Sequence, residues 1–425
     1  MAKVALIGTC DTKLRELVFL RDRIQETSGV SAILIDVGRN ETKNDAISIS
    51  QSELLAKYGG GKNISELSRR NFIEFISPCA SEAVQELYQS GTIDGVVSIG
   101  GSCGTSLASA IMRQVLPIGF PKLIVSTIAS GDTSHIVGET DIMLLYSVVD
   151  IAGLNQVLRD VLSNAGVAIA AAALSYAGRR ASKEKLPSSK KRVGITMFGV
   201  TTPAVDVIRS HLESNYPIET TVFHATGPGG RAMERLVRDG ELDAVIDLTT
   251  TEICDFVMGG VMSAGDKRLD AAAEVGVPTI VSLGATDMAN FGPTVTVPAK
   301  YRNRKTVEHN PITTLVRSSA DDCRQIGEFI CVKLRNARRP EMVQLWIPKG
   351  GVSMLAVPGG PFADGEADGV LFSTIRDGLA GSGVEVVDDE RDINDAGFAR
   401  DVAEALVAKM GLEPMDTFQS RSNVH

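Results

Sequence analysis

Short apolar runs alternate with longer mixed segments along the first half of the chain. The runs are apolar throughout, which is typical of strands buried on both faces of a parallel sheet. The intervening segments are predicted as helices that cover the sheet. The predicted strands are residues 4–8, 31–38, 94–101 and 122–129, and the predicted helices are residues 12–26, 64–89 and 105–114.

The second half repeats this alternation. Its predicted strands are residues 192–198, 219–225, 242–248 and 279–284, and its predicted helices are residues 202–213, 231–238 and 394–410. Strands that alternate with helices in this way indicate a doubly wound sheet. The expected fold class is therefore α/β, with two doubly wound, Rossmann-like parallel-sheet domains that face each other across a cleft.

A basic segment separates the two halves. Residues 178–192 combine seven basic residues with one proline and three serines, and a new apolar run follows at once. Such a composition predicts a solvated linker, with a phosphate-binding patch as the alternative. The expected domains are residues 1–178 and 193–425. Residues 150–176 are predicted as one long helix that packs across both halves.

Composition narrows the class of partners. The 425 residues carry a formal net charge of -9, which disfavours binding to nucleic acid. The six cysteines are scattered without short Cys or His spacings, so neither a zinc site nor a disulfide framework is indicated. The apolar stretch 165–174 is too short to span a membrane, and the N-terminus has no signal-like run. We expect no membrane contact, a cytoplasmic location and reduced thiols.

Ligands of doubly wound domains bind at the carboxyl ends of the strands. The first such loop offers Thr9, Asp11 and Lys13, which could contact a phosphate or Mg²⁺, or could simply start a helix. Asp36 ends the second predicted strand, where related nucleotide proteins hold ribose hydroxyls. The chain has no G-x-x-x-x-G-K-S/T loop, so a nucleotide site would be of another kind.

A glycine-rich turn follows the third predicted strand. Small residues here let the main chain approach an anion, and the free amides and dipole at the start of a helix favour negative charge. The same residues could form only a tight turn. The predicted anion contacts are Gly100, Gly101, Ser102, Gly104 and Thr105.

Cys103 lies inside this turn and is a candidate nucleophile. A nucleophile needs a base, and no histidine belongs to this strand, loop and helix, so Cys103 could equally be a small residue that fills the turn. The next strand-end loop adds Gly131, Asp132 and Thr133 as further candidate ligand contacts. Asp11 and Asp132 are the candidate ligands for a metal ion.

The second half contains a loose dinucleotide pattern. Gly227, Gly229 and Ala232 match G-x-G-x-x-A, and Asp247 follows at about the spacing that NAD-binding proteins use. The motif follows the second strand of its domain rather than the first, which counts against NAD. Gly229 and Gly230 are the candidate contacts of this loop with a ligand from the first domain.

Acid–base candidates also occur in the second half. Glu252 follows a predicted strand, and His309 stands in a basic segment with Arg302, Arg304 and Lys305. His309 and Glu252 could act as acid or base, and the basic segment could receive a carboxylate or phosphate. The alternative for that segment is an exposed basic loop.

Several motifs together resemble a known family. "GTCDTK", "SIGGSCGTSLAS", "GDTSHIVGETDI", "ATGPGGRAMERLV" and "EHNP" occur in this order over nearly the whole chain. The set is similar to the family of the ATP-binding N-terminal domain of the tomato mosaic virus resistance protein. The resemblance implies a two-domain protein that binds ATP, with Mg²⁺, and that forms a homodimer.

The expected function is therefore ATP binding through the glycine-rich turn, with Mg²⁺ as a second ligand. Two alternatives stay open. The chain could be an enzyme that acts on a phosphorylated or carboxylated small metabolite in the interdomain cleft, or an NAD-dependent oxidoreductase.

Overall fold

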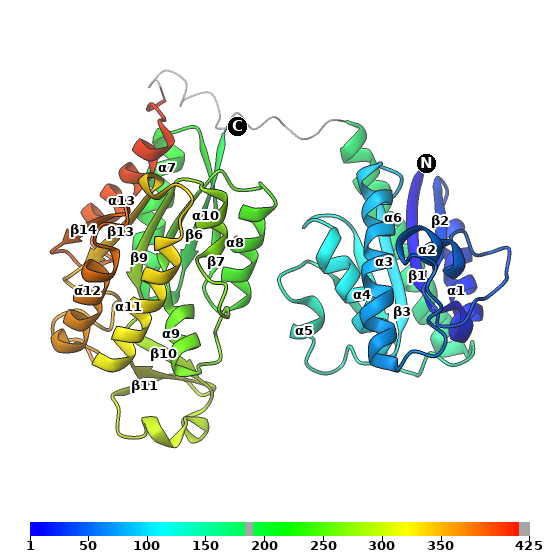
Figure 1. Ribbon diagram of the computed structural model, residues 1–425, viewed down its shortest axis with the longest axis horizontal. Coiled ribbons are helices and arrows are strands. Elements are labelled where there is room, and N and C mark those ends of the chain that lie inside the picture. The colour runs from blue at the N-terminus through cyan, green and yellow to red at the C-terminus, as the bar shows by residue number, and fades with distance from the viewer. Residues whose placement is uncertain (183–189, 416–425) are drawn as a thin grey trace. The chain divides into compact units, whose positions relative to one another are not determined.

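The computed structural model describes residues 1–182 and 190–415. The chain divides into two compact units, Met1–Pro187 and Ser188–His425, and each unit is described here by itself (Figure 1). The middle of the predicted linker, residues 183–189, lies outside the described residues. The helix before it continues to Ala181, three residues beyond the predicted start of the linker at residue 178.

The first unit is built on a five-stranded parallel sheet in the order β2-β1-β3-β4-β5. Helices α1 and α6 share one apolar core with the sheet, and α3 and α4 share the other, so both faces are covered. Its strands are β1 (Ala2–Gly8), β2 (Val30–Asp36), β3 (Gly95–Gly100), β4 (Lys122–Ser126) and β5 (Met143–Tyr146). Its helices are α1 (Cys10–Gln25), α2 (Gln51–Tyr58), α3 (Arg69–Gln89), α4 (Ser102–Val115), α5 (Ser134–Val137) and α6 (Gln156–Ala181).

Helix α6 starts later than the apolar pattern predicts. Gly153 has φ +84°, and the side chain of Asn155 accepts a hydrogen bond from the amide of Leu158, so the helix begins at Gln156 rather than at residue 150. By length and composition α6 could cross a membrane. Its buried side chains pack with those of α1 and the sheet in the core of the first unit.

The second unit is built on a six-stranded parallel sheet in the order β14-β13-β9-β8-β6-β7. An antiparallel sheet in the order β10-β12-β11 interrupts it after β9. The parallel strands are β6 (Lys191–Met197), β7 (Ile218–His224), β8 (Ala244–Thr249), β9 (Thr279–Gly284), β13 (Val343–Pro348) and β14 (Glu385–Asp389). The antiparallel strands are β10 (Met288–Phe291), β11 (Thr306–Asn310) and β12 (Thr313–Arg317).

Seven α-helices and four short 3₁₀ turns connect these strands in the described part of the second unit. The helices are α7 (Thr202–Asn215), α8 (Pro228–Arg238), α9 (Thr251–Met258), α10 (Asp270–Val275), α11 (Ala320–Arg335), α12 (Gly365–Leu379) and α13 (Ala396–Met410). The 3₁₀ turns are η1 (Gly199–Thr201), η2 (Thr294–Thr296), η3 (Ala299–Tyr301) and η4 (Pro340–Met342). Both units are thus doubly wound, Rossmann-like α/β domains.

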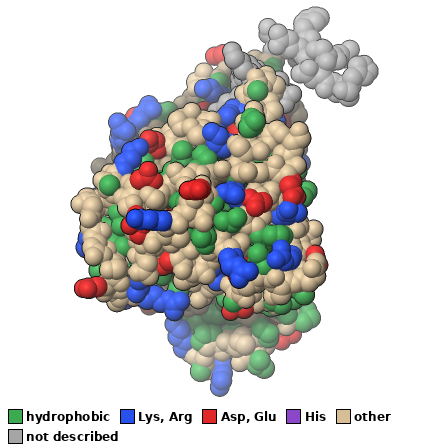
Figure 2. Space-filling model, turned by 90° about the vertical axis from the view of Figure 1, so that its right-hand side faces the viewer, with side chains coloured by type: hydrophobic (Ala, Val, Ile, Leu, Met, Phe, Trp, Pro, Cys, Tyr) green, Lys and Arg blue, Asp and Glu red, His purple; other side chains and the backbone are tan. Residues whose placement is uncertain are grey.

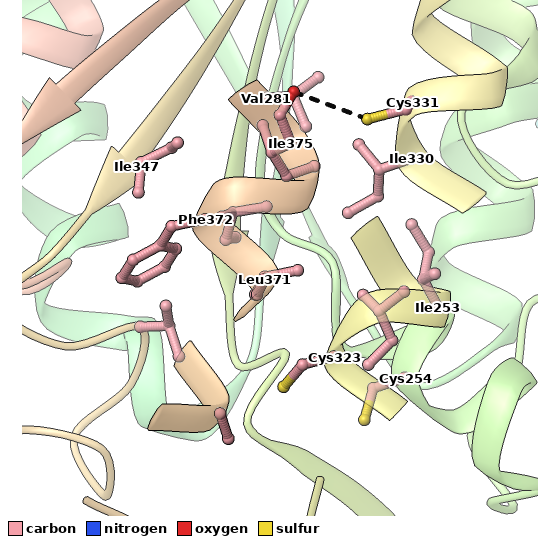
Figure 3. Close-up of a cluster of buried hydrophobic side chains, with 14 of the residues drawn as sticks. Ile253, Cys254, Val281, Cys323, Ile330, Cys331, Ile347, Leu371, Phe372 and Ile375 are labelled. Atoms are coloured by element: carbon pink, nitrogen blue, oxygen red, sulfur yellow. Dashed lines mark hydrogen bonds between the residues drawn. The ribbon is translucent and has the colours of Figure 1, made fainter. Parts of the chain in front are cut away.

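The largest apolar cluster of the second unit lies between α9, α11, α12 and the sheet (Figure 3). Cys254 and Cys323 are fully buried in it, and the thiol of Cys331 lies 3.8 Å from the carbonyl oxygen of Ile375. Burial raises the pKa of Cys254 well above its ordinary value, which keeps this thiol protonated and unreactive. These cysteines are core residues.

Candidate nucleotide site

The switch point of the first sheet lies between β1 and β3. The chain leaves β1 toward β2 on one side, and it leaves β3 toward β4 on the other, so the loops after Gly8 and Gly100 diverge. Such divergence opens a crevice at the carboxyl edge of a sheet. A pocket of about 580 Å³ opens here, which is within the usual range for ligand sites. It is lined by Thr9, Asp11, Thr12, Lys13, Arg39, Asn40, Arg69, Phe72, Ile73, Gly101, Ser102, Cys103 and Gly104.

The first turn of α4 forms one wall of the pocket. Gly101 is the N-cap residue and no side chain caps the helix, so the amides of residues 102–104 keep free N–H groups. Gly100 has to be glycine, because a Cβ there would lie 2.8 Å from the Cα of Gly104. The close approach of β3 and α4 therefore places three amides and the positive end of the helix dipole at the pocket.

Thr105 does not take part in this wall. Its side chain is fully buried, and its hydroxyl lies 2.7 Å from that of Ser126 at the end of β4. The predicted ligand contact through this hydroxyl is therefore corrected: Thr105 joins α4 to the sheet.

The loop after β1 forms a second wall. Helix α1 begins at Cys10, and the side chain of its N-cap residue Thr9 makes no capping bond to the helix. Lys13 departs from helical geometry, with φ -135°, and its Nζ donates to the carbonyl oxygen of Ile151 at 2.5 Å. Lys13 thus reaches the pocket while it holds the loop that follows β5.

Asp36 is enclosed rather than available to a ribose. It is fully buried, and its Oδ1 accepts hydrogen bonds from the amides of Cys10 at 3.0 Å and Gly38 at 2.8 Å. Burial raises the pKa of Asp36 above its ordinary value. The expected contact with ribose hydroxyls is therefore corrected: the carboxyl group fastens the loop after β2 to the start of α1.

Asp11 has a similar structural function. Its Oδ2 accepts hydrogen bonds from the amides of Arg39 at 3.0 Å and Asn40 at 3.1 Å. Its Oδ1 is buried without a hydrogen-bond partner, and a Cβ on Gly38 would lie only 2.8 Å from it. Asp11 lines the pocket but holds the loop that carries Arg39.

Two cations in the pocket are absent from the sequence prediction. Arg39 follows β2, and its guanidinium lies over the ring of Phe72 with 5.2 Å between the guanidinium carbon and the ring centroid. Arg69 is the first residue of α3. Among the described residues, neither of these arginines nor Lys13 forms an ion pair with a carboxylate. On the face shown in Figure 2, basic and acidic side chains are interspersed.

The third predicted loop lies outside this pocket. Gly131 and Asp132 are exposed, and Asp132 Oδ1 accepts a hydrogen bond from the amide of Ser134 at 3.0 Å. Together with Thr133, these residues form the turn that leads into α5. None of the three lines the pocket described above.

Cys103 does line the pocket and is partly buried. The described residues that line the pocket include no histidine. The geometry therefore supplies no partner for Cys103 as a nucleophile.

The glycine loop of the second unit is already filled by a side chain of the same chain. Glu252 is fully buried, and its Oε1 accepts hydrogen bonds from the amides of Gly227 at 2.6 Å and Gly230 at 3.0 Å, at the start of α8. A Cβ on Gly229 would lie 1.9 Å from the carbonyl oxygen of His224, and one on Gly230 would lie 1.9 Å from Glu252 Oε2. The prediction of a ligand at Gly229 and Gly230 is therefore corrected.

A buried arginine neutralises Glu252. Arg268 donates to Glu252 Oε2 at 2.7 Å, pairs with both oxygens of Asp247, and lies 3.4 Å from Glu234. Burial acts to lower the pKa of Arg268, but Asp247 and Glu252 raise it, so the guanidinium stays charged. Glu252 has no access to a substrate, which corrects its predicted acid–base function. Asp247 is likewise unavailable to the ribose of NAD.

The predicted basic segment does not form a cluster within the second unit. Arg304 pairs with Asp322, and Lys305 Nζ donates to the carbonyl oxygen of Ala363 at 2.7 Å. Arg302 is exposed, and His309 is exposed on β11 at an edge of the antiparallel sheet. Among the residues that the structure describes in this unit, no side chain makes a hydrogen bond that would orient His309 as a general base.

A buried carboxyl group predicts a pH dependence of stability. Asp255 accepts hydrogen bonds from the backbone amide of Asn290 at 2.9 Å and its side-chain Nδ2 at 2.6 Å, and burial raises its pKa to about 7. The folded state thus binds this proton more tightly than the unfolded chain. The stabilisation is complete below pH about 4 and is lost as the pH rises through about 7, at about 1.4 kcal/mol per pH unit.

We expect Asp255→Asn to remove this part of the pH dependence. Asn290 Oδ1 has no partner, so an amide flip can accommodate the new side chain. Urea unfolding between pH 4 and 8, followed by the fluorescence of Trp346, the single tryptophan, measures the effect. Asp377→Asn, on the exposed side of α12, is the control. The prediction would be contradicted if the free energy of unfolding changed equally with pH in the two variants.

Known proteins with similar sequences cover both units. The N-terminal and C-terminal domains of the uncharacterised protein family UPF0261 match residues 2–178 and 190–410. A UPF0261 protein of Clostridium tetani is 40% identical over 412 residues, 96% of this chain and 99% of that protein. One of Mesorhizobium japonicum is 42% identical over 407 residues, with the same coverage of both chains.

The ToMV resistance protein Tm-1 of Solanum lycopersicum is 39% identical over 393 residues, 88% of this chain and 51% of that protein. Among solved structures, the UDP-GlcNAc 2-epimerase of Neisseria meningitidis is 9% identical and covers 96% of this chain and 99% of its own, with a TM-score of 0.21. The family matches extend over nearly all of both units. The chain therefore belongs to the uncharacterised protein family UPF0261.

Proposed function

We infer that the first unit binds an anionic nucleotide, with ATP as the first candidate, through its phosphates. One observation carries this proposal: the uncapped amides of residues 102–104 open into a pocket lined by three cations that have no carboxylate partner among the described residues. Free amides at a helix start and unpaired cations are the groups that bind phosphate. The resemblance to an ATP-binding family supports the choice of ATP.

The proposal is limited to nucleotide binding by this chain. The chain spans about half of the tomato protein's length, 51%, and we propose no antiviral role for it. NAD is disfavoured, because Glu252 occupies the amides of the dinucleotide-like loop.

A thermal-shift screen of the full chain tests the proposal. Ligands that bind only the folded state raise the melting temperature. We expect ATP to raise it in a concentration-dependent manner and NADH to leave it unchanged. No shift with ATP, ADP or GTP at millimolar concentration would contradict the proposal.

Replacement of Cys103 separates two functions of the pocket. Cys103→Ala keeps the backbone amide and removes only the thiol, so we expect the dissociation constant for ATP to change by less than about threefold, which is under 1 kcal/mol. Isothermal titration of both proteins measures it. A loss of affinity of tenfold or more would mean that the thiol, rather than the amide, contacts the ligand.

A further inference from the structure

We propose that the pocket binds its phosphate ligand directly through Lys13, Arg39 and Arg69, as a metal-free polyanion rather than as the Mg²⁺ complex. This inference rests on the proposed nucleotide site. It differs from the sequence prediction, which includes Mg²⁺. The reason for the difference is the set of charged side chains that line the pocket.

Of the two carboxylates that could hold Mg²⁺, only Asp11 lines the pocket, and its oxygens lie against the loop after β2. Mg²⁺ in nucleotide sites is held by one or two carboxylates together with phosphates and water. Asp11 Oδ2 is engaged by the amides of Arg39 and Asn40, and Asp11 Oδ1 is buried against Gly38. Asp132 lies in the exposed turn before α5.

Arg39 is held in place on both sides. Its amide donates to Asp11 Oδ2 at 3.0 Å, and its carbonyl oxygen accepts from Gln51 Nε2 at 2.6 Å. Its guanidinium rests on the Phe72 ring, as in a cation–π contact. The side chain is therefore ordered before a ligand arrives, and an ordered guanidinium loses less freedom when it binds phosphate.

Arg69 occupies a position that is unfavourable for stability. A cation in the first turn of a helix opposes the helix dipole, and the first turn of α3 contains no acidic residue. The next residue, Arg70, is paired with Glu74 at 2.8 Å, whereas Arg69 has no carboxylate partner among the described residues and lines the pocket. Arg69 is exposed, and an anion bound beside it would offset this unfavourable charge.

These cations supply the positive charge that Mg²⁺ supplies in other nucleotide sites. A Mg²⁺ ion on the phosphates would cancel part of the ligand's negative charge and would lie among like charges. Asp36 is enclosed and Arg39 covers the Phe72 ring, so neither Asp36 nor that ring is available to a sugar or a base. The uncharged polar side chains in the lining are those of Thr9, Thr12, Asn40 and Ser102. Recognition then depends on the charge of the phosphate chain.

Isothermal titration of the full chain with ATP, in EDTA and in excess MgCl₂, tests this inference. We expect binding in EDTA to be tighter by about tenfold, and inorganic tripolyphosphate to compete with ATP in EDTA. Equal or tighter binding in MgCl₂ would overturn the inference and leave the proposed nucleotide site standing. No binding in either buffer would overturn both.

Neighbouring arginines provide a matched pair of variants. We expect Arg69→Met to weaken the binding of metal-free ATP by about tenfold, because a charged donor to phosphate is lost. The difference in ATP affinity between EDTA and MgCl₂ should become smaller for the same reason. Arg70→Met should leave both constants unchanged. The melting temperatures of the free variants verify that they fold. The same affinity for the two variants would overturn the assignment of Arg69.

Discussion

Arg268→Met is expected to destabilise the second unit by about 3–5 kcal/mol, the range for breaking a buried charge network by removing one partner. Arg268 is 1% exposed and is the cation shared by Glu234, Asp247 and Glu252. Its loss leaves Asp247 and Glu252 without the cation that pairs with them, and leaves Glu234 with Arg238 at 3.7 Å. Burial already raises the pKa of Glu234, so protonation of this carboxylate can offset part of the lost stability.

Urea unfolding followed by tryptophan fluorescence measures this effect for the second unit alone. The single tryptophan, Trp346, lies on β13 and packs against Phe398 of α13, with ring centroids 5.7 Å apart. The control is Arg376→Met, which removes a half-exposed arginine paired with Asp388 and should cost less than about 1 kcal/mol. Similar losses for both variants would show that the buried network is not a major source of stability.

The two units share one architecture but differ in what binds the amides at the start of a helix. In the first unit the helix after β3 begins with amides that line a pocket, and no side chain among the described residues caps them. In the second unit the amides at the start of α8 are taken by Glu252, and Arg268 balances its charge. One helix start is available to a ligand, and the other is filled by the chain itself.

This difference explains why the glycine motifs mislead in the second unit. Glycine is required at Gly100 because α4 approaches the backbone of β3, and at Gly230 because Glu252 approaches α8. Both structural requirements select glycine, so the sequence alone does not distinguish them. The side chain that fills the second site lies more than twenty residues away, and its position follows only from the fold.

The candidate site could be predicted in part for a similar reason. Thr9, Asp11, Lys13 and residues 101–104 follow strands that the apolar pattern identifies, so the rule for strand ends brings them to one edge. Arg39, three residues after Asp36, satisfies the same rule and could have been found. Arg69 could not, because it reaches the pocket only through the packing of α3.

Parts of the second unit are absent from the sequence prediction. Strands β13 and β14 and the antiparallel sheet lie in a region whose Gly and Pro residues favour turns. Strand β11 is largely exposed, so it lacks the continuous apolar run that marks the buried parallel strands. Patterns of burial therefore predict the parallel sheets better than this insertion.

Gly100→Ala is expected to weaken ATP binding by about 100-fold, which corresponds to about 2.7 kcal/mol and to one or two lost hydrogen bonds to a charged ligand. The new Cβ would lie 2.8 Å from Gly104 Cα, 3.1 Å from its carbonyl carbon and 3.2 Å from the amide nitrogen of Thr105. All three are backbone atoms, so the first turn of α4 has to move away from β3. The amides that line the pocket move with it.

Gly178→Ala, on the exposed end of α6 and outside the pocket, is the control, because its Cβ would meet nothing within 4 Å. Isothermal titration with ATP compares both variants with the parent chain, and circular dichroism on heating verifies that each is folded. Overpacking at Gly100 should also cost about 1–3 kcal/mol of stability. A folded Gly100→Ala variant that binds ATP as tightly as Gly178→Ala would mean that the phosphates do not contact the start of α4. The ligand would then be held by the side-chain cations alone. In that case the affinity for ATP would fall only when Arg39 or Arg69 is replaced.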